Sequence, residues 1–384
     1  MDQLSTVASR IDPPESIEVA QVAMKRSQEG HDVVNLGWGE PHFATPQTVV
    51  AALHDSVDRG ETNYTESAGI EPLRNRIAEK LELENDLAAS PDEIVVTPGA
   101  KQALFVVIRA IVDAGDEILL PEPAWTSYAK MIELAGATPV QIAGSPENRF
   151  VPTKQQFREA VTPETTAIIV NTPGNPTGAV LRQSELESIA TVARENDLFV
   201  IADEVYEQYT FDERNHISIG SLNGMNDRTI TVNGLSKSHA MTGWRLGYLH
   251  AVPEIRSVAL RVNQHLNTCA TSFVQHAAVE AFDATSHLSE VVETYEKNRD
   301  VFVDTIPFPA VVPEGAFYCL LDVRAYTDDE GEFAKQLLEE TNVALTPGRT
   351  YGSAAAGFLR ASLAVETDQI REAARRVAAW DENQ

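Results

Sequence analysis

The chain has 384 residues, of which 43% are hydrophobic and 23% charged, a composition typical of a globular protein long enough for two domains. Its 57 acidic and 30 basic residues give a formal net charge of −27, and such a surface repels nucleic acid and anionic membranes, which excludes both as favourable partners. The cysteines, Cys269 and Cys319, are too few and too isolated for a disulfide framework or a metal cluster.

Two causes could explain the acidity, and both concern the surface rather than the fold. In a salt-adapted protein, dense carboxylates hold water and cations while salt screens their repulsion; otherwise this is an ordinary protein of unusually acidic composition. Arg outnumbers Lys and the acidic residues are scattered rather than gathered in a tail, so we favour salt adaptation. Residues 1–10 lack the profile of a signal peptide and no apolar run reaches membrane-spanning length, so we expect a cytoplasmic protein.

Between about residues 92 and 251, short β-branched runs alternate with longer amphipathic stretches. Nearly continuous apolar strands separated by helices predict a mostly parallel sheet covered on both faces. The expected strands are residues 93–97, 117–121, 138–142, 166–171, 198–204 and 229–234, and the expected helices include 101–113, 127–136 and 184–196.

The pattern changes after about residue 280, where a long polar helix precedes mixed strands and helices. This change predicts a smaller α+β domain, which the N-terminal segment joins. We therefore expect a large domain at residues 46–280 and a small domain made of residues 1–45 and 281–384.

Ligands of an open parallel sheet bind beyond the carboxyl ends of its strands, so the residues that follow each strand matter most. Residues 98–101 (PGAK) open a helix, where small side chains let backbone N–H groups approach an anion, although an ordinary strand-to-helix turn has the same composition. Residues 172–178 (TPGNPTG) form a stiff loop that presents Asn175, with a simple proline-rich turn as the alternative.

Two charged residues follow strands of the expected sheet. Asp203 ends an apolar strand, where a buried carboxylate needs a cationic or donor partner; the alternative is that it caps the next helix. Lys237 follows another strand, with Ser236 beside it and Arg245 one short loop away, a combination that suits a phosphate. A desolvated lysine near these cations would have a lowered pKa and serve as a Schiff-base amine, whereas most lysines are solvated surface groups.

Residues 233–248 (NGLSKSHAMTGWRLGY) resemble the cofactor-lysine segment of class I aminotransferases, which have the type I pyridoxal-phosphate fold. The resemblance implies a mostly parallel seven-stranded sheet in a large domain, a smaller α+β domain, a homodimer and pyridoxal 5'-phosphate as cofactor. Other segments similar to signatures of this family are residues 37–46 (GWGEPHFATP), 62–74 (TNYTESAGIEPLR), 171–178 (NTPGNPTG), 202–206 (ADEVY) and 358–364 (FLRASLA).

The resemblance also implies a role for single positions around the cofactor ring. Lys237 would carry the cofactor and then move a proton between the substrate's α-carbon and the cofactor. Asp203 would pair with the pyridinium nitrogen. Asn175 and Tyr206 would hydrogen-bond the phenolic oxygen, and Trp125 would stack on the ring, although a tryptophan there could equally belong to the core.

At the phosphate, the resemblance implies binding by two side chains and the start of a helix. Ser236 and Arg245 would contact the phosphate together with the backbone of the turn at Gly99, Ala100 and Lys101. Tyr64 would reach it from the neighbouring subunit, so that a homodimer shares its active sites.

The substrate is expected to bind through its α-carboxylate. Arg360 would clamp this group bidentately, helped by the Gly39 backbone and the Asn175 amide. Without the resemblance, Arg360 could equally be a charge on an edge strand.

The residues expected around the substrate's side chain favour two different classes of substrate. Lys101 stands where some aspartate-using relatives place a cation for the distal carboxylate, which favours aspartate with 2-oxoglutarate. Ile17 and Trp38 instead predict an apolar rim for aromatic or aliphatic side chains, and residues 218–237 and 267–278 resemble archaeal aromatic aminotransferases. We favour aspartate and keep the aromatic substrates as the alternative.

Two other classes of function use the same fold. A lyase that eliminates the β-substituent of sulfur amino acids would use Lys237 and Asp203 without an oxo-acid acceptor. A cofactor-binding regulator would need a basic DNA-binding module, for which this acidic chain has little room. The absorbance of the cofactor distinguishes them, because an aminotransferase converts the band with an amino acid and restores it with an oxo acid.

Overall fold

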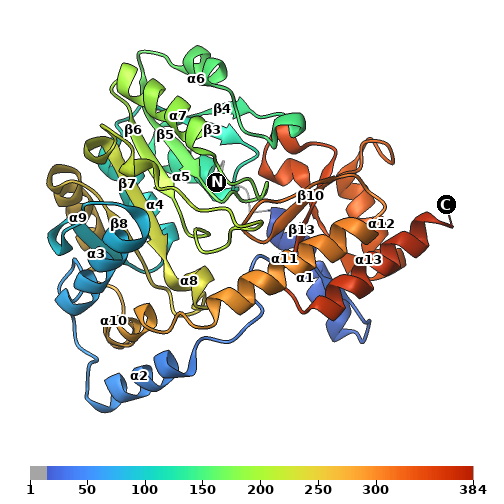
Figure 1. Ribbon diagram of the computed structural model, residues 1–384, viewed down its shortest axis with the longest axis horizontal. Helices are drawn as coiled ribbons and strands as arrows, with labels where there is room; N and C mark the ends of the chain where they lie inside the picture. Colours follow the sequence, from blue (N-terminus) through green and yellow to red (C-terminus); the bar gives the residue numbers. More distant parts are fainter. Residues whose placement is uncertain (1–14, 384) are drawn as a thin grey trace, which may run out of the picture.

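The computed structural model describes residues 15–383 of the chain, and a sheet of seven strands is its largest element (Figure 1). All neighbouring strands are parallel except β8, which is antiparallel to both β2 and β7, so the predicted mostly parallel seven-stranded sheet is confirmed. In spatial order the strands are β2 (Ile94–Thr97), β8 (Gly247–His250), β7 (Thr229–Gly234), β6 (Phe199–Asp203), β5 (Thr165–Asn171), β3 (Glu117–Glu122) and β4 (Thr138–Ala143).

Helices cover both faces of this sheet, which explains why its central strands are apolar on both sides. One face packs on α4 (Ala100–Ile111), α5 (Ser127–Ala135) and α9 (Pro253–Asn267). The other face packs on α6 (Lys154–Ala160) and α7 (Gln183–Glu195). At the β2 end of the sheet lie α2 (Gln47–Asp58), α3 (Glu71–Asn85) and α10 (Ser272–Ala278).

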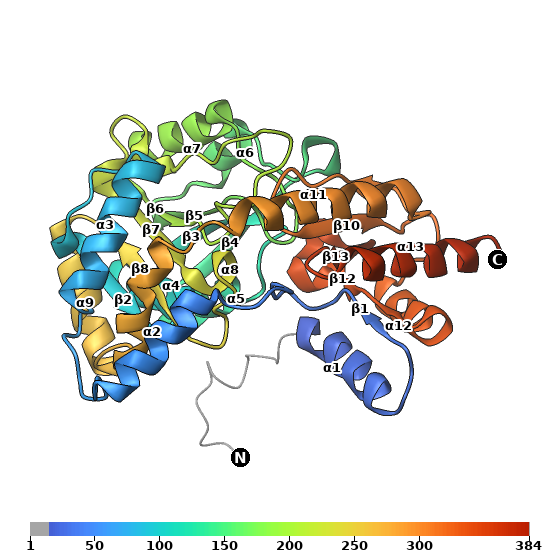
Figure 2. The same ribbon diagram turned by 60° about the horizontal axis from the view of Figure 1, so that its bottom comes forward.

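A second sheet contains four antiparallel strands and lies beside the first (Figures 1 and 2). Its strands in spatial order are β12 (Thr346–Pro347), β13 (Phe358–Ser362), β10 (Tyr318–Asp322) and β9 (Ala310–Val311). They share an apolar core with α11 (Leu288–Thr305), α12 (Glu330–Thr341) and α13 (Thr367–Asp381).

The N-terminal segment packs against the C-terminal part of the chain. Strand β1 (Val34–Asn35) pairs in parallel with β11 (Val343–Ala344), and Ala23 of α1 (Glu15–Gln28) packs on Leu338 and Ala344. Figure 2 shows α1 and β1 beside α12. The domain boundaries at residues 46 and 281 stay a prediction, and residues 1–14 of the expected small domain lie outside the described part.

Short helical turns complete the described structure. In residues 15–383 no helix is both long enough and apolar enough to cross a membrane. The remaining helices are α8 (Leu235–Ser238) and the 3-10 turns η2 (Pro91–Glu93), η3 (Pro146–Asn148), η4 (Ile219–Ser221), η5 (Asn226–Arg228), η6 (Glu280–Phe282), η7 (Gly348–Tyr351) and η8 (Ser353–Ala355).

Candidate active site

A cavity of about 450 Å³ opens where strands of the large sheet end and the second sheet begins. Asn171 and Asp203 are register partners at the ends of β5 and β6, and β7 runs directly into α8, so parallel pairing brings these ends together. The predicted site residues that line the cavity are Trp38, Gly39, Ala100, Lys101, Trp125, Asn175, Asp203, Tyr206, Ser236, Lys237, Arg245 and Arg360.

Three predicted site residues are not part of this lining. Gly99 lies behind it, with a φ of +89°, and a Cβ there would stand 2.7 Å from Nη2 of Arg245. The turn needs glycine because a residue with a side chain would be strained at this φ, and the guanidinium of Arg245 lies against the bare backbone. Tyr64 is 87% exposed and does not line the cavity of its own chain. Ile17 lies in α1, but its side chain is outside the part of the chain whose side chains the structure describes.

Lys237 lines the cavity and is held in place by contacts of its backbone and its amine. The hydroxyl of Tyr209 donates to the Lys237 carbonyl at 2.7 Å, and Nζ donates to the Gly39 carbonyl at 2.7 Å. Burial of the amine lowers its pKa from 10.5 to about 8, since a low-dielectric environment disfavours the cation. Its amine therefore loses its proton closer to neutral pH than an ordinary lysine does, as the sequence predicted for a nucleophilic amine.

Asp203 is 3% exposed and faces the same cavity. Its Oδ2 accepts a hydrogen bond from the Tyr128 hydroxyl at 2.6 Å, and its Oδ1 accepts a longer one, 3.4 Å, from the Val205 amide. Burial raises the pKa of Asp203 from 3.8 to about 6. The alternative that it caps a helix is wrong, because residues 205–208 form a turn.

Arg360 lies on β13, an inner strand of the second sheet, and is 4% exposed, so the alternative of an edge charge is wrong. Its guanidinium donates to the Gly37 carbonyl at 2.7 Å and to the Asn175 side-chain oxygen at 3.4 Å. The rings of Tyr318 and Tyr351 lie 4.5 and 4.9 Å from its central carbon. These contacts hold a planar donor group toward the cavity.

At one end of the cavity, groups that favour an anion converge. Ala100 begins α4, whose N-terminus offers unpaired N–H groups, and Ser236 and Arg245 line the same space. Arg245 has a φ of +58°, uncommon for a residue with a side chain, and its Nη1 donates to the Thr242 carbonyl at 2.7 Å. Lys101 lies with Nζ 4.8 Å from the centre of the Trp125 ring, and burial, with Arg245 nearby, lowers its pKa.

Nine further residues of the described part of the chain line the cavity and were missed by sequence reasoning, and those with polar or charged groups near the site include Glu40, Tyr128, Asn171, Tyr318 and Tyr351. The Glu40 carboxylate accepts from the Trp38 indole at 2.9 Å and contacts the Thr242 hydroxyl, which lowers its pKa. A Cβ at Gly39 would collide with the Tyr318 hydroxyl, which also hydrogen-bonds the Tyr206 hydroxyl at 2.9 Å. Glu40 and Asn171 could have been identified from the sequence because they lie inside the motifs at residues 37–46 and 171–178. The tyrosines lie outside these motifs.

The residues that line the cavity suit the phosphate, the ring nitrogen and the aldehyde of pyridoxal phosphate. Cationic and N–H donors stand at the α4 end, a carboxylate at Asp203 suits a protonated ring nitrogen, and the amine of Lys237 is available between them. Among the described residues, Nε of Arg360 is buried without a hydrogen-bond partner, which leaves donor capacity for a substrate carboxylate.

Comparison with known proteins agrees with this fit. A sequence profile described as "Aminotransferase class I and II" matches residues 31–377. The chain is 36% identical to an aspartate aminotransferase of Bacillus subtilis over 98% of both chains. It is 40% identical to an aspartate aminotransferase of Pyrococcus abyssi, over 90% of this chain and 91% of the relative.

Solved structures show the same fold over nearly the whole chain. The aspartate aminotransferase of Thermus thermophilus with maleate has a TM-score of 0.94 at 38% identity and covers 99% of this chain and 100% of its own. The aromatic aminotransferase of Pyrococcus horikoshii OT3 has a TM-score of 0.90 at 38% identity and covers 94% and 99%, respectively. This chain belongs to the class I and II aminotransferases and, with pyridoxal phosphate as cofactor, transfers amino groups between amino acids and 2-oxo acids.

Proposed function

We propose that the enzyme transfers the amino group of aspartate to 2-oxoglutarate. The observation that carries this proposal is that, besides Lys237 and Arg245, which are assigned to the cofactor, two cationic side chains, Arg360 and Lys101, line one cavity of about 450 Å³. A dicarboxylate needs a cation for each end, and relatives named aspartate aminotransferases cover nearly the whole chain. Aromatic amino acids are the second candidate, because Trp38 lines the same cavity at 43% exposure and an aromatic aminotransferase has the same fold.

In this reaction each catalytic residue has a separate role. The bound cofactor supplies an electron sink that weakens the α-carbon–hydrogen bond of the substrate. Lys237 takes that proton on Nζ, which its lowered pKa of about 8 equips it to hold and release near neutral pH. Asp203, with a pKa of about 6, is ionised at neutral pH and supplies the charge that a protonated ring nitrogen needs. Arg360 and Asn175 orient the α-carboxylate.

The remaining tasks concern binding. Ser236, Arg245 and the backbone of Gly99, Ala100 and Lys101 hold the phosphate, as their convergence at the α4 end suggests. Tyr206 would hydrogen-bond the cofactor ring and Trp125 would stack on it, since both line the cavity. Trp38 lines the pocket, and the Gly39 backbone would assist Arg360.

The substrate assignment predicts a selective effect of replacing Lys101 with Met. Loss of one charge-assisted hydrogen bond of about 2 kcal/mol should raise the KM for aspartate about 30-fold. The KM for phenylalanine should stay within about twofold, because that side chain has no distal carboxylate. Steady-state kinetics with each donor and 2-oxoglutarate measure both values. Lys130→Met, on α5 with a side chain 39% exposed, is the matched control. Equal losses for both substrates would contradict the assignment.

We also propose a homodimer with shared active sites, supported by the exposure of Tyr64 at 87% and the implied contact of this residue with the neighbour's phosphate site. Hybrid dimers test it. One subunit carries Lys237→Ala and the other Tyr64→Glu, whose carboxylate would repel a phosphate. A shared-site hybrid, isolated through two different tags, has one site with both defects and one with neither. It should recover about half the activity of the native dimer, although both parent variants are nearly inactive.

Unshared sites give the opposite result, because each subunit of the hybrid would then contain one damaged site. The control is Tyr326→Glu, a tyrosine 40% exposed that does not line the cavity. A monomer in analytical ultracentrifugation would also contradict the proposal.

The surface is proposed to be salt-adapted, because a net charge of −27 repels itself at low ionic strength. Raising KCl from 0.1 M to 1 M shortens the screening length from about 10 Å to about 3 Å and should raise Tm by at least about 4 °C. Differential scanning calorimetry measures this shift. Sucrose at matched osmolality is the control, since it is excluded from the surface without screening charge. A Tm that does not rise in KCl, or rises equally in sucrose, would disprove the adaptation.

Two further assignments complete the proposal. The division into residues 46–280 and residues 1–45 with 281–384 is supported by the separate cores of the two sheets. A cytoplasmic location is supported by the two free cysteines, Cys269 and Cys319, of which Cys319 is buried.

A further inference from the structure

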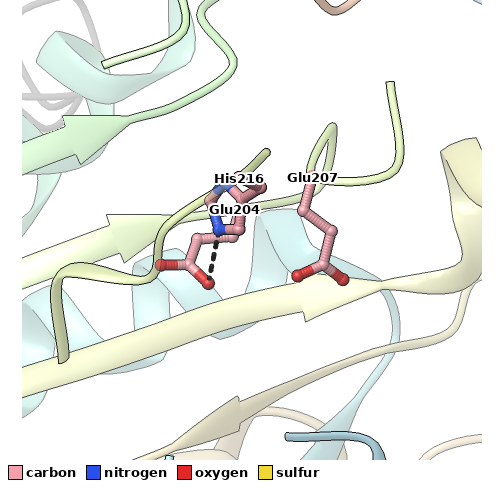
Figure 3. A group of neighbouring side chains, drawn as sticks. All are labelled: Glu204, Glu207 and His216. Carbon is pink, nitrogen blue, oxygen red and sulfur yellow. Dashed lines mark ion pairs between the residues drawn. The ribbon is translucent and has the colours of Figure 1, made fainter. Parts of the chain in front are cut away.

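A buried polar cluster lies directly behind the cavity, on the segment that connects Asp203 to Tyr209. Asp203 and Tyr206 line the cavity, whereas Glu204 and Glu207 do not. Glu204 is 1% exposed, and the side chain of Glu207 is 9% exposed. Figure 3 shows these carboxylates with His216 beside Glu204. The segment thus alternates between catalytic groups on one side and buried acids on the other.

The contacts of Glu204 come from three side chains on other segments. Its Oε2 accepts from the Ser218 hydroxyl at 2.7 Å and from Nδ2 of Asn85 at 3.3 Å, and Nε2 of His216 lies 3.3 Å away. The His216 side chain is itself 8% exposed. Because water has little access, the charge on Glu204 depends on these partners.

Glu207 has a cation of its own. The ammonium of Lys80 contacts Oε1, and Nδ2 of Asn233 donates to the same oxygen at 2.7 Å. Asn85 donates to Oε2 at 2.7 Å and so bridges the two carboxylates. The two buried acids face one permanent cation, since Glu84, which also lies near Lys80, is 46% exposed in its side chain, so a neutral buried cluster requires a second positive charge.

His216 is the available second cation. Burial opposes its charge, but Glu204 raises the pKa of the imidazole above the ordinary value of 6.5. Burial would likewise raise the pKa of Glu207, yet Lys80 and then His216 hold it below the usual range. The charged and titratable groups that face this cluster are Glu204, Glu207, Lys80, His216, Glu84, Tyr248 and His250.

Hydrogen bonds connect the cluster to the segment that carries Asp203 and to the segment that carries Lys237. On the Asp203 side, the Glu204 amide donates to the Val232 carbonyl at 3.0 Å, next to the Asp203–Val232 register pair. On the Lys237 side, the Asn233 side-chain oxygen accepts from the Gly234 amide at 2.7 Å, just before α8. A shift of the cluster would therefore move Asp203 and Lys237 relative to each other.

A bound divalent metal is the other reading of this arrangement, because ligand atoms of Glu204, Glu207 and His216 lie within 4.8 Å of one another. Lys80 argues against it. Its ammonium already contacts Glu207, and a divalent ion would give the cluster an excess of positive charge.

We propose that Lys80 and a cationic His216 balance Glu204 and Glu207, and that His216 is thereby a positioning residue for Asp203 and Lys237. This inference rests on the roles proposed above for those two residues. A neutral His216 would leave Glu204 buried without a counter-ion, and relaxation of that strand end would displace Asp203.

The test uses the full-length enzyme with His216→Gln, which keeps a hydrogen-bond donor but removes the charge. We expect kcat to fall about 10-fold with KM for aspartate unchanged, since small misplacements at a reacting centre are costly and Arg360 is untouched. The pH midpoint of the cofactor's absorbance band should also shift. His31→Gln, at an exposed histidine, is the matched control.

Stability of the cofactor-free protein gives an independent readout. His216 has a raised pKa in the folded state, so its contribution is fully present below the unfolded pKa of about 6.5 and is lost as pH rises through the folded value. His216→Gln should lose that part of the pH dependence of Tm. The double variant His216→Gln with Glu204→Gln should recover stability, because it also removes the unpaired carboxylate.

The outcomes separate the inference from the proposed function. Unchanged kcat, band midpoint and pH dependence of Tm in His216→Gln would overturn the inference, as would a double variant no more stable than the single one. One equivalent of metal bound to the native protein and lost in His216→Gln would overturn it too. If the proposed function fails, aspartate will not convert the cofactor band of the native enzyme and 2-oxoglutarate will not restore it, while the pH dependence of the cofactor-free protein still tests the cluster.

Discussion

Replacing Lys237 with Ala is expected to lower kcat by at least about 10⁴-fold, because the change removes both the nucleophilic amine and the proton carrier. The yellow band of the cofactor should convert to that of the free compound and should no longer respond to aspartate. Stopped-flow absorbance and steady-state transamination measure these effects. Lys130→Ala, at a lysine outside the cavity, should leave both unchanged. Turnover at the native rate in Lys237→Ala would contradict the assignment.

The same variant makes a prediction about stability in the absence of cofactor. The folded-state pKa of Lys237, about 8, lies below its ordinary value of 10.5, so the fold disfavours the cation. The resulting destabilisation is present below pH 8 and disappears as the pH rises toward 10.5. Lys237→Ala should therefore be more stable than the native cofactor-free protein at pH 7, with the difference shrinking above pH 8. A variant that is less stable at pH 7 would show that the amine supports the fold.

Replacing Arg360 with Gln should reduce kcat/KM for aspartate by roughly 10³-fold, since two charge-assisted hydrogen bonds to the α-carboxylate are lost. Arg360→Lys should lose about 10²-fold, because an ammonium keeps the charge but cannot bind bidentately. The Gly37 carbonyl and the rings of Tyr318 and Tyr351 orient a guanidinium, and an ammonium would use them poorly. Steady-state kinetics check both values.

The controls for Arg360 address its role in folding. Both variants should retain the cofactor band, because Arg360 is assigned to the substrate rather than to the cofactor. Arg375→Gln, at an arginine 66% exposed in its side chain, should have native kinetics. Reaction with an amine that lacks a carboxylate should be slow but equal in native and variant enzymes. Loss of the band in Arg360→Gln would mean that the residue supports the fold instead.

The part of the site that lies on the large sheet could be predicted from the sequence because parallel strands end at one edge. Asp203 ends one strand of the sheet, and Asn175 and Lys237 follow two others, so recognition of the strands was enough to predict that these residues lie together. The motif at residues 358–364 placed Arg360 in a strand, but whether that strand lies at an edge depends on pairing. Only the structure shows β13 between β12 and β10.

The tyrosines could not be predicted because their positions depend on packing between elements. The Tyr128 hydroxyl reaches Asp203 only because α5 packs against the sheet near β6. We expected a cationic or donor partner for Asp203, and the partner proved to be this hydroxyl. Tyr318 and Tyr351 belong to the second sheet and its following turn, and the way that two sheets pack leaves no periodic signal in a sequence.

The pairing of β1 with β11 has a consequence for how the enzyme is made. The cavity wall at Gly37 and Gly39 follows β1 directly, yet the partner strand is Val343–Ala344, near the opposite end of the chain. Proteins leave the ribosome N-terminus first, so residues up to Ala344 must be synthesised before this wall has its supporting strand. The large sheet can form earlier. A translation product that ends before β11 would therefore contain Lys237 but lack the strand that supports this wall of the cavity.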